Sequence, residues 1–463
     1  MLSKDIPNLV NHIRCYANRL ENSKELLDIY ENDLLKYVER LLKSEMGVQT
    51  YEQIVTRIPP INMVKKIVDK LSTIYQSGVV RKVVDGNDSD QELLEYYVDK
   101  FDINPKMNQG NEFFNLDRYN LMMPFLDDEN KKPALRAVPN DKFLVYSNNE
   151  INPMVPTHVM LMLKKVDCIK IKGKMTQSWM VWTKDEITIF DEDGDERLDL
   201  YFEGMDGTNP YGVLPFQYYN SSQNFLVPPA DSDTKRMAVL MPAQFADLNY
   251  AAKFQSFSSI FAFNVDEENW TLAPNAVHFL DDKPGGGNAR VEVVKPQVDI
   301  TEVTQLIVTQ LSMYLNSRGI KPGSIGDITT QNLASGISKI IDEADTSELK
   351  TMQAAVYARG EVSFWRKVLT QMHPIWMNQT DAPKTTFSVG ARIEVTFPPQ
   401  KPMVDRGTLV TTAVNEINNG LKSRKTVMEE LNPDWSLDRI EEEIDLIDGV
   451  GDGFTAEDSN QST

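Results

Sequence analysis

Residue types that carry redox and metal chemistry are scarce in this sequence. Its 463 residues include two cysteines, Cys15 and Cys168, which lie far apart and outside any CxxC or Cys/His cluster. This spacing excludes the zinc sites that paired cysteines build and predicts inert thiols in a reducing compartment. No histidine belongs to an HExxH or HxH motif, so none indicates a catalytic or metal-binding role. The four histidines are His12, His158, His278 and His373.

Long hydrophobic runs are also missing. No stretch reaches the ~18 apolar residues that indicate a membrane-spanning helix. The N-terminal residues carry charged and amide side chains throughout and lack the apolar centre of a signal peptide. We therefore expect no membrane contact and synthesis in a cytoplasm.

Catalytic motifs are equally hard to find. The GxxxxGK[ST] phosphate loop does not occur, and the glycines before Asn288 lack the lysine that would cradle phosphates. No GxSxG elbow presents a serine nucleophile. The acidic run Asp191–Glu196 offers oxygen ligands for a divalent cation, but its glycine falls at position four, not at the sixth position of an EF-hand loop. We expect an acidic hairpin turn there, no cofactor and no enzyme activity. A metal-dependent nuclease using these carboxylates is the alternative.

Acidic residues, by contrast, are in excess. The formal net charge is -20, and 429–463 alone holds twelve acidic residues against one basic residue, which leaves -9 on the rest of the chain. Because affinity for nucleic acid comes largely from Lys and Arg, this balance argues against tight gripping of phosphates. We interpret the acidic end as a solvated helix followed by a disordered tail. The chain exceeds the ~250–300 residues of a single core, so at least two packed regions are expected.

Hydrophobic spacing predicts helices first and strands after them. One helix is predicted over Asn22–Glu45, and a second begins after Pro60 and ends before Gly78. Between about 127 and 228, short β-branched and aromatic runs alternate with Asn, Pro and Gly, which is typical of strands. Asp193-Gly194 has the composition of a hairpin turn between two of these strands.

The C-terminal half returns to helix. Segments 231–263, 300–318 and 337–373 have helical spacing, and Pro374 ends the third. Strand-like and flexible sequence separates the first two helices, and a polar loop separates the last two. A strand then precedes short helices, one of which opens near Ser423. The sequence therefore predicts an α+β fold that is mainly helical, in which two long helices bracket a small β excursion.

In Thr56–Val83 an Asn precedes a helix that ends in a Tyr and a short basic stretch. In Leu333–Gln353 a Ser-Gly-Ile run opens a long helix. From Phe397 to Ile447, an FxP strand end, a helix, a Gly-x-x-Ser turn and an Asp-x-x-x-Glu helix follow in order. In this order the three stretches resemble the portal proteins of tailed double-stranded DNA bacteriophages, and the second is similar to the opening of the long helix that follows the portal tunnel loop.

The resemblance implies a portal fold with wing, stem, clip and crown, repeated around a ring. The parts would be a wing at 1–230 with a β subdomain at about 127–228, a first stem helix at 231–261, a clip at 262–298, a second stem helix at 299–319, a tunnel loop at 320–335, a long wing helix at 336–376, a wing strand region at 377–400, crown helices at 401–448 and a disordered acidic tail at 449–463.

The resemblance also implies a function. A homo-oligomeric, dodecameric ring would stand at one capsid vertex of the virion, after synthesis in the host bacterial cytoplasm. Double-stranded DNA would pass through its channel without sequence specificity during packaging and ejection. The large terminase and then a head-tail adaptor would dock on it, and major capsid and scaffolding proteins would surround it. Another virion connector or tail ring protein is the alternative.

Site residues follow from these regions. The tunnel loop and its flank supply candidate phosphate contacts, and Arg318 alternatively caps its helix through the C-terminal dipole. These candidates are Arg318, Lys321, Gln331 and Asn332. In the clip, mixed charges suit a contact that exchanges terminase for adaptor, and a plain exposed hairpin loop is the alternative. The clip candidates are Asp281, Asp282, Lys283 and Arg290.

Overall fold

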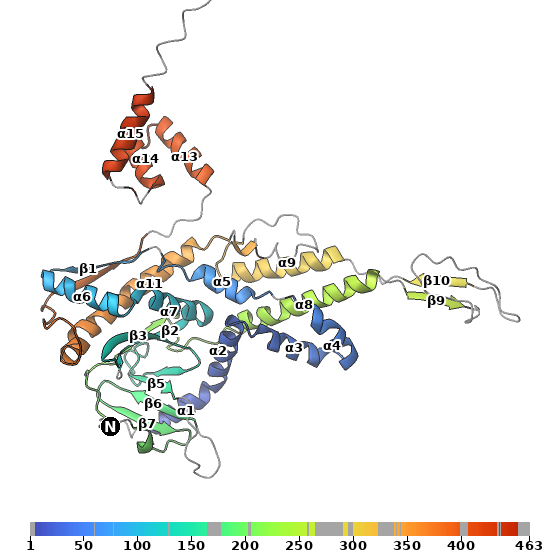
Figure 1. The fold of residues 1–463 in the computed structure, drawn as a ribbon. Helices are drawn as coiled ribbons and strands as arrows, with labels where there is room; N and C mark the ends of the chain where they lie inside the picture. The colour runs from blue at the N-terminus through green and yellow to red at the C-terminus, as the bar shows by residue number, and fades with distance from the viewer. Residues whose placement is uncertain are drawn as a thin grey trace, which may run out of the picture. The chain divides into compact units, whose positions relative to one another are not determined.

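The computed structural model divides into two compact units, Met1–Gln400 and Lys401–Thr463. The first unit mixes helices with antiparallel sheets (Figure 1), which confirms the α+β class. None of the described helices combines the length and the apolar composition that crossing a membrane requires. The described residues are 5–59, 61–76, 78–127, 130–163, 177–201, 205–256, 259–263, 290–294, 300–322, 338, 340–342, 344–398, 406–432, 435 and 437–451.

The N-terminal helices are shorter than the sequence pattern predicts. α2 (Ala17–Tyr30) and α3 (Leu34–Glu45) replace the single helix predicted over Asn22–Glu45. The chain turns between them at Asn32, whose φ of 82° is a left-handed conformation that Asn tolerates better than most residues. The second predicted helix, α5 (Met63–Leu71), likewise ends well before Gly78. The other helices here are α1 (Ile6–Cys15), α4 (Val48–Ile54) and the 3-10 turn η2 (Val55–Arg57).

Two antiparallel sheets form the β subdomain. One has the order β3-β2-β8, and the other is a meander in the order β4-β5-β6-β7. β2 begins before the predicted start near 127, because it follows α7 (Ile103–Asp117) directly through the left-handed residue Arg118. The strands are β2 (Tyr119–Asp127), β3 (Lys132–Val138), β4 (Phe143–Tyr146), β5 (His158–Met162), β6 (Ser178–Trp182), β7 (Ile187–Asp191) and β8 (Gln217–Asn220).

The hairpin in this subdomain does not turn where the sequence predicts. β6 and β7 pair directly, so their turn lies at Thr183–Glu186. Asp193-Gly194 follows β7 and folds the chain back into one isolated bridge between Phe190 and Glu196. Asp191 Oδ1 fixes this fold by accepting from the backbone N–H groups of Asp193 and Asp195, both at 3.1 Å. The prediction of a second full strand after Asp193-Gly194 is therefore wrong.

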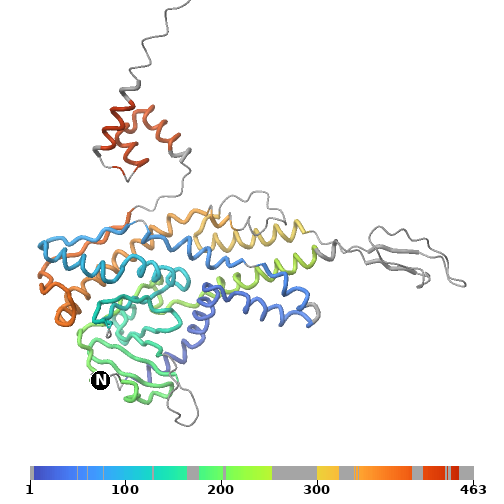
Figure 2. The backbone as a smooth tube through the Cα atoms, in the orientation of Figure 1, coloured from blue at the N-terminus to red at the C-terminus, as the bar shows by residue number. Residues whose placement is uncertain are grey.

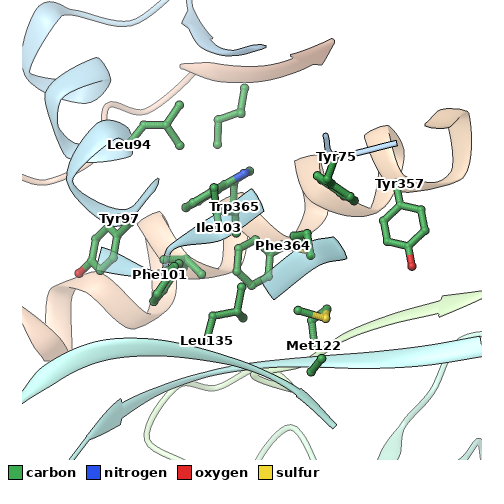
Figure 3. Close-up of a cluster of buried hydrophobic side chains, with 14 of the residues drawn as sticks. Tyr75, Leu94, Tyr97, Phe101, Ile103, Met122, Leu135, Tyr357, Phe364 and Trp365 are labelled. Atoms are coloured by element: carbon green, nitrogen blue, oxygen red, sulfur yellow. The ribbon is translucent and has the colours of Figure 1, made fainter. Parts of the chain in front are cut away.

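An aromatic cluster fills the space between α6 (Asp88–Lys100), α7, α11 (Ser347–Lys367) and the β2–β3 strands (Figure 3). The ring centroid of Phe101 lies 5.5, 6.0 and 6.1 Å from those of Tyr97, Phe364 and Trp365. These are contact distances for aromatic pairs, and each fully buried ring stabilises the fold by about 1.5–3 kcal/mol. The cluster makes α11 the central helix of this unit.

A strand pair joins distant parts of the chain above this cluster. β1 (Val80–Val84) pairs antiparallel with β11 (Arg392–Thr396), more than 300 residues away in sequence. Arg81 on β1 donates two hydrogen bonds, of 2.6 and 3.0 Å, to the buried Glu361 carboxylate on α11. Trp365 Nε1 donates to the same carboxylate at 3.1 Å. The buried Glu361 is thus neutralised by a residue that only this strand pairing brings near.

The long C-terminal helix differs from its predicted bounds of 337–373. α11 begins at Ser347, whose N–H donates to Asp345 Oδ1 at 2.9 Å. A π-helical turn, η6 (Val368–Met372), then leads into α12 (His373–Trp376). Pro374 stands at the start of α12, where a missing N–H costs no helical hydrogen bond. The prediction that Pro374 ends the helix is therefore wrong.

Two helices with a strand pair between them in sequence form the rest of this unit. α8 (Ser232–Ser256) and α9 (Ile300–Ser317) lie side by side (Figures 1 and 2). β9 (Ser259–Phe263) and β10 (Arg290–Val294) pair antiparallel. The pattern over 231–263 predicts helix throughout, but its last residues, rich in Ile and Phe, form β9. The predicted order of helix, β excursion and helix is confirmed.

The described residues of the second unit form three helices. α13 (Arg406–Asn418), α14 (Arg424–Leu431) and α15 (Leu437–Gly451) follow one another, and α14 packs against both of the others. Ser423 Oγ accepts from Thr426 N–H at 3.2 Å, which confirms the predicted helix start near Ser423. α15 includes Gly451, past the predicted tail boundary at 449, and 452–463 lie outside the described residues.

Close packing at Gly360 in α11 gives a stability test. A Cβ at Gly360 would meet Tyr219 Cε1 at 2.1 Å, and the buried Tyr219 ring stacks on Tyr357 at 4.4 Å. We expect Gly360→Ala to lower the free energy of unfolding by about 1–3 kcal/mol, although alanine in an open helix normally stabilises by about 1 kcal/mol. Chemical unfolding midpoints measure the change. Gly47→Ala, which has no neighbour within 4 Å, is the matched control; equal midpoints for the two variants would contradict this packing.

Candidate nucleic-acid contact site

A buried carboxylate connects the start of α8 to the end of α9. Asp231 Oδ1 accepts from Thr234 N–H at 3.1 Å, so Asp231 caps the N-terminus of α8. Arg318, just after α9, forms an ion pair with Asp231 and donates to Thr234 Oγ1. The Arg318 guanidinium also lies 5.6 Å from the ring centroid of Tyr314. Because 2% of the Asp231 side chain and 20% of the Arg318 side chain are exposed, this pair is largely withdrawn from water.

A second arginine reaches the same carboxylate from the β subdomain. Arg118 Nε lies 3.8 Å from Asp231 Oδ2. Burial lowers the pKa of Arg318 to about 10, and the charge of Arg118 acts in the same direction. Arg318 still carries its charge at neutral pH. Asp231 therefore holds together three elements that would otherwise bring two positive charges into contact.

A backbone bridge connects the residues that follow α9 to those that precede α11. Lys321 and Asp345 exchange backbone hydrogen bonds of 2.9 and 3.3 Å. The Lys321 amine lies 3.6 Å from Glu348 Oε2, and both side chains are mostly exposed. A Lys–Glu pair in water contributes little stability. Lys321 is thus fixed by its backbone, while its amine stays accessible to solvent.

Lysines from α5 gather at the same place. Lys66 Nζ lies 2.9 Å from Asp342 Oδ2, and Lys70 donates to the backbone carbonyl of Asp342. Burial lowers the pKa of Lys350 on α11, and the charge of Lys70 adds to this shift. Hydrogen bonds from Ser347 lower the pKa of Asp345, with Lys321 and Lys70 contributing. Together Lys66, Lys70, Lys321 and Lys350 form what we call the loop-base lysines.

Three of these four lysines are not among the predicted site residues. Lys321 falls within the predicted tunnel loop at 320–335, but Lys66 and Lys70 lie more than 240 residues earlier in the chain. Their only sequence signal is that they stand apart from the apolar stripe of α5. Tertiary packing alone brings them to the start of α11.

Of the other predicted site residues, the structure describes Arg318 and Arg290. Arg318 is engaged with Asp231 rather than with the carbonyls at the end of its own helix, and its contact with phosphate stays a prediction. Arg290 is the first residue of β10, opposite Phe263. Gln331 and Asn332 of the loop, and Asp281, Asp282 and Lys283 of the clip, lie outside the described residues.

The acidic run Asp191–Glu196 is occupied by local hydrogen bonds. Besides the Asp191 turn, Glu192 Oε1 accepts from Gln177 N–H at 2.9 Å, and Glu196 Oε1 accepts from the Tyr201 hydroxyl at 2.8 Å. In the part of the chain that the structure describes, no group of three or more His, Cys, Asp or Glu side chains is placed to hold a metal ion. These contacts match the predicted acidic turn.

Comparison with known proteins adds one observation. No protein-family model and no curated protein sequence matches the chain. Among solved structures, it is similar to a chain described as the neck of an empty GTA particle computed with C6 symmetry. The similarity covers 83% of this chain and 94% of that chain, at a TM-score of 0.38 and 10% sequence identity. Neither value is high enough to assign a common fold.

The Asp231–Arg318 pair can be tested by a double-mutant cycle. Removing one partner of a buried ion pair typically costs about 3–5 kcal/mol. We expect Arg318→Gln to lower the free energy of unfolding by about 3 kcal/mol, the lower end of this range, because Arg118 still neutralises part of the Asp231 charge. Asp231→Asn keeps the α8 cap but leaves the two arginines facing each other. Chemical unfolding of both single variants and the double variant should give a coupling energy above about 1 kcal/mol. Additive losses would show that the pair does not hold the helices together; Lys184→Gln, on an exposed turn, is the control.

Proposed function

We propose that the chain is the protomer of a phage portal ring, the channel for genome packaging and ejection. The helix pair α8 and α9, with β9 and β10 between them in sequence, carries this proposal. The junction at Asp231 adds support, because it fixes both helix ends to the β subdomain and leads directly into the predicted tunnel loop at 320–335. The order α8, β9–β10 and α9 supports the stem, clip and stem that the sequence resemblance implies.

Charge supports a channel that does not hold DNA firmly. A ring of twelve copies would carry on the order of -240 charges, which repel a polyanion within the ~8–10 Å screening distance of physiological salt. α9 contributes one charged residue, Glu302, and exposes Leu306 and Met313. A wall with few cations suits sliding, since each phosphate contact strengthens binding.

Sparse contacts to DNA would come from the loop base. Lys321 is the accessible amine there, and the other loop-base lysines add positive potential behind it. Arg318, which is paired with Asp231, would also hold the start of the loop. Such contacts touch the backbone without reading bases. By the same proposal, the clip at 262–298 docks the large terminase and then the head-tail adaptor, and capsid and scaffolding proteins surround the ring in the virion.

Imaging of purified protein tests the ring. We expect negative-stain electron micrographs of the full chain to show annular particles with a central hole. Size-exclusion chromatography with light scattering should give a mass near that of twelve copies. A monodisperse monomer, or open filaments without closed rings, would remove the portal proposal.

Charge reversal at Lys321 tests the contact with DNA. We expect Lys321→Glu to leave rings intact but to change the length or the retention of packaged DNA, because a repulsive charge replaces an attractive one beside the channel. Packaged length measured by gel electrophoresis of particle DNA reports the effect. Lys184→Glu makes the same charge change on an exposed turn far along the sequence and should not alter packaging. An unchanged packaged length in Lys321→Glu would count against this site.

A further inference from the structure

The second unit exposes more apolar surface than its small core explains. Among its described hydrophobic residues, Ala413, Val427 and Ile440 are buried. Two groups on different helices are exposed instead. The α13 patch consists of Val410, Val414 and Leu421, which are 42, 48 and 74% exposed. The α15 patch consists of Leu446 and Ile447, which are 64 and 50% exposed.

The α13 patch has the geometry of a helix-packing seam. Its residues, with the partly buried Ile417 between them, recur at spacings of four, three and four, which place them on one face of a helix. Leu421 lies beyond Asn418, the last residue of α13, but backbone hydrogen bonds hold it against the C-terminal end of this helix. Leu421 N–H donates to Glu416 O at 2.9 Å and Gly420 N–H to Ile417 O at 3.0 Å, a Schellman motif completed by the φ of +70° at Gly420.

The charges around the two patches differ. From Gly407 to Leu421 the sequence contains one charged residue, Glu416, and Lys422 Nζ lies 3.0 Å from its carboxylate. The α15 patch instead lies beside several carboxylates, and Lys425 pairs with one of them, Glu441. Two α15 patches facing each other would bring like charges together. The uncharged α13 patch can receive the α15 patch without that repulsion.

The two patches lie on the outer helices of the unit, since α14 packs against both α13 and α15 (Figure 1). A ring is built from heterologous contacts, in which one surface of a copy meets a different surface of the next copy. A symmetric dimer would need only one patch that contacts itself. Two unlike, complementary patches are what a closed ring requires.

We propose that the α13 patch of each copy packs against the α15 patch of a second copy of this chain. The contact rests on the proposed ring, and it identifies the second unit as a part of the interface between neighbouring protomers. Burial of both patches would supply apolar area that the unit lacks by itself.

Cysteine cross-linking in the full chain tests this contact. In a background with Cys15→Ser and Cys168→Ser, we expect Val414→Cys with Ile447→Cys, treated with a short bis-maleimide, to give a ladder of covalent oligomers on denaturing gels. Val414→Cys alone should stay monomeric, because identical positions do not meet in a heterologous contact. Val414→Cys with Thr426→Cys, on the middle helix, is the matched control and should not form a ladder.

Three results would overturn the contact. Covalent dimers from Val414→Cys alone would indicate a symmetric α13 seam. A single intramolecular product from the double variant would place the two patches together within one chain. Closed rings in negative stain without any ladder would refute the contact while leaving the ring intact. An absence of rings would instead remove the proposed function, so the two failures are distinguishable.

Discussion

The Asp231 carboxylate cannot remain buried without positive partners, because removing an ion from water costs several kcal/mol unless its charge is neutralised. Arg318 supplies one partner from the end of α9, and Arg118 supplies a weaker one from the start of β2. Asp231 therefore joins the helix pair to the β subdomain. The same contact holds the end of α9, from which the chain continues to Lys321.

A second buried carboxylate has the same role near the aromatic cluster. Glu361 on α11 is neutralised by Arg81 on β1, which β11 holds in place. The two carboxylates differ in what they connect: Asp231 joins the helix pair to the β subdomain, whereas Glu361 joins α11 to β1, which in turn pairs with β11.

Local signals located elements whose neighbours are close in sequence. The stripe of α9 and the side-chain cap at Ser423 both depend on residues three or four positions apart, and the structure has helices there. The predictions are wrong where a few residues fix the local backbone conformation, because the periodicity of hydrophobic residues carries no information about it. Asn32 adopts a left-handed turn within a continuous apolar pattern, Pro374 stands where a helix begins, and the Asp191 side chain folds Asp193-Gly194 into a tight return.

The sequence by itself determined the α+β class, the order of helix, β excursion and helix, and the acidic excess, because composition and short-range periodicity encode these directly. Only the tertiary structure decided that Arg318 forms an ion pair with Asp231, that Lys66 and Lys70 lie near Lys321, and that β1 pairs with β11. These contacts join residues far apart in the chain, and the burial that makes them favourable exists only after the elements have packed.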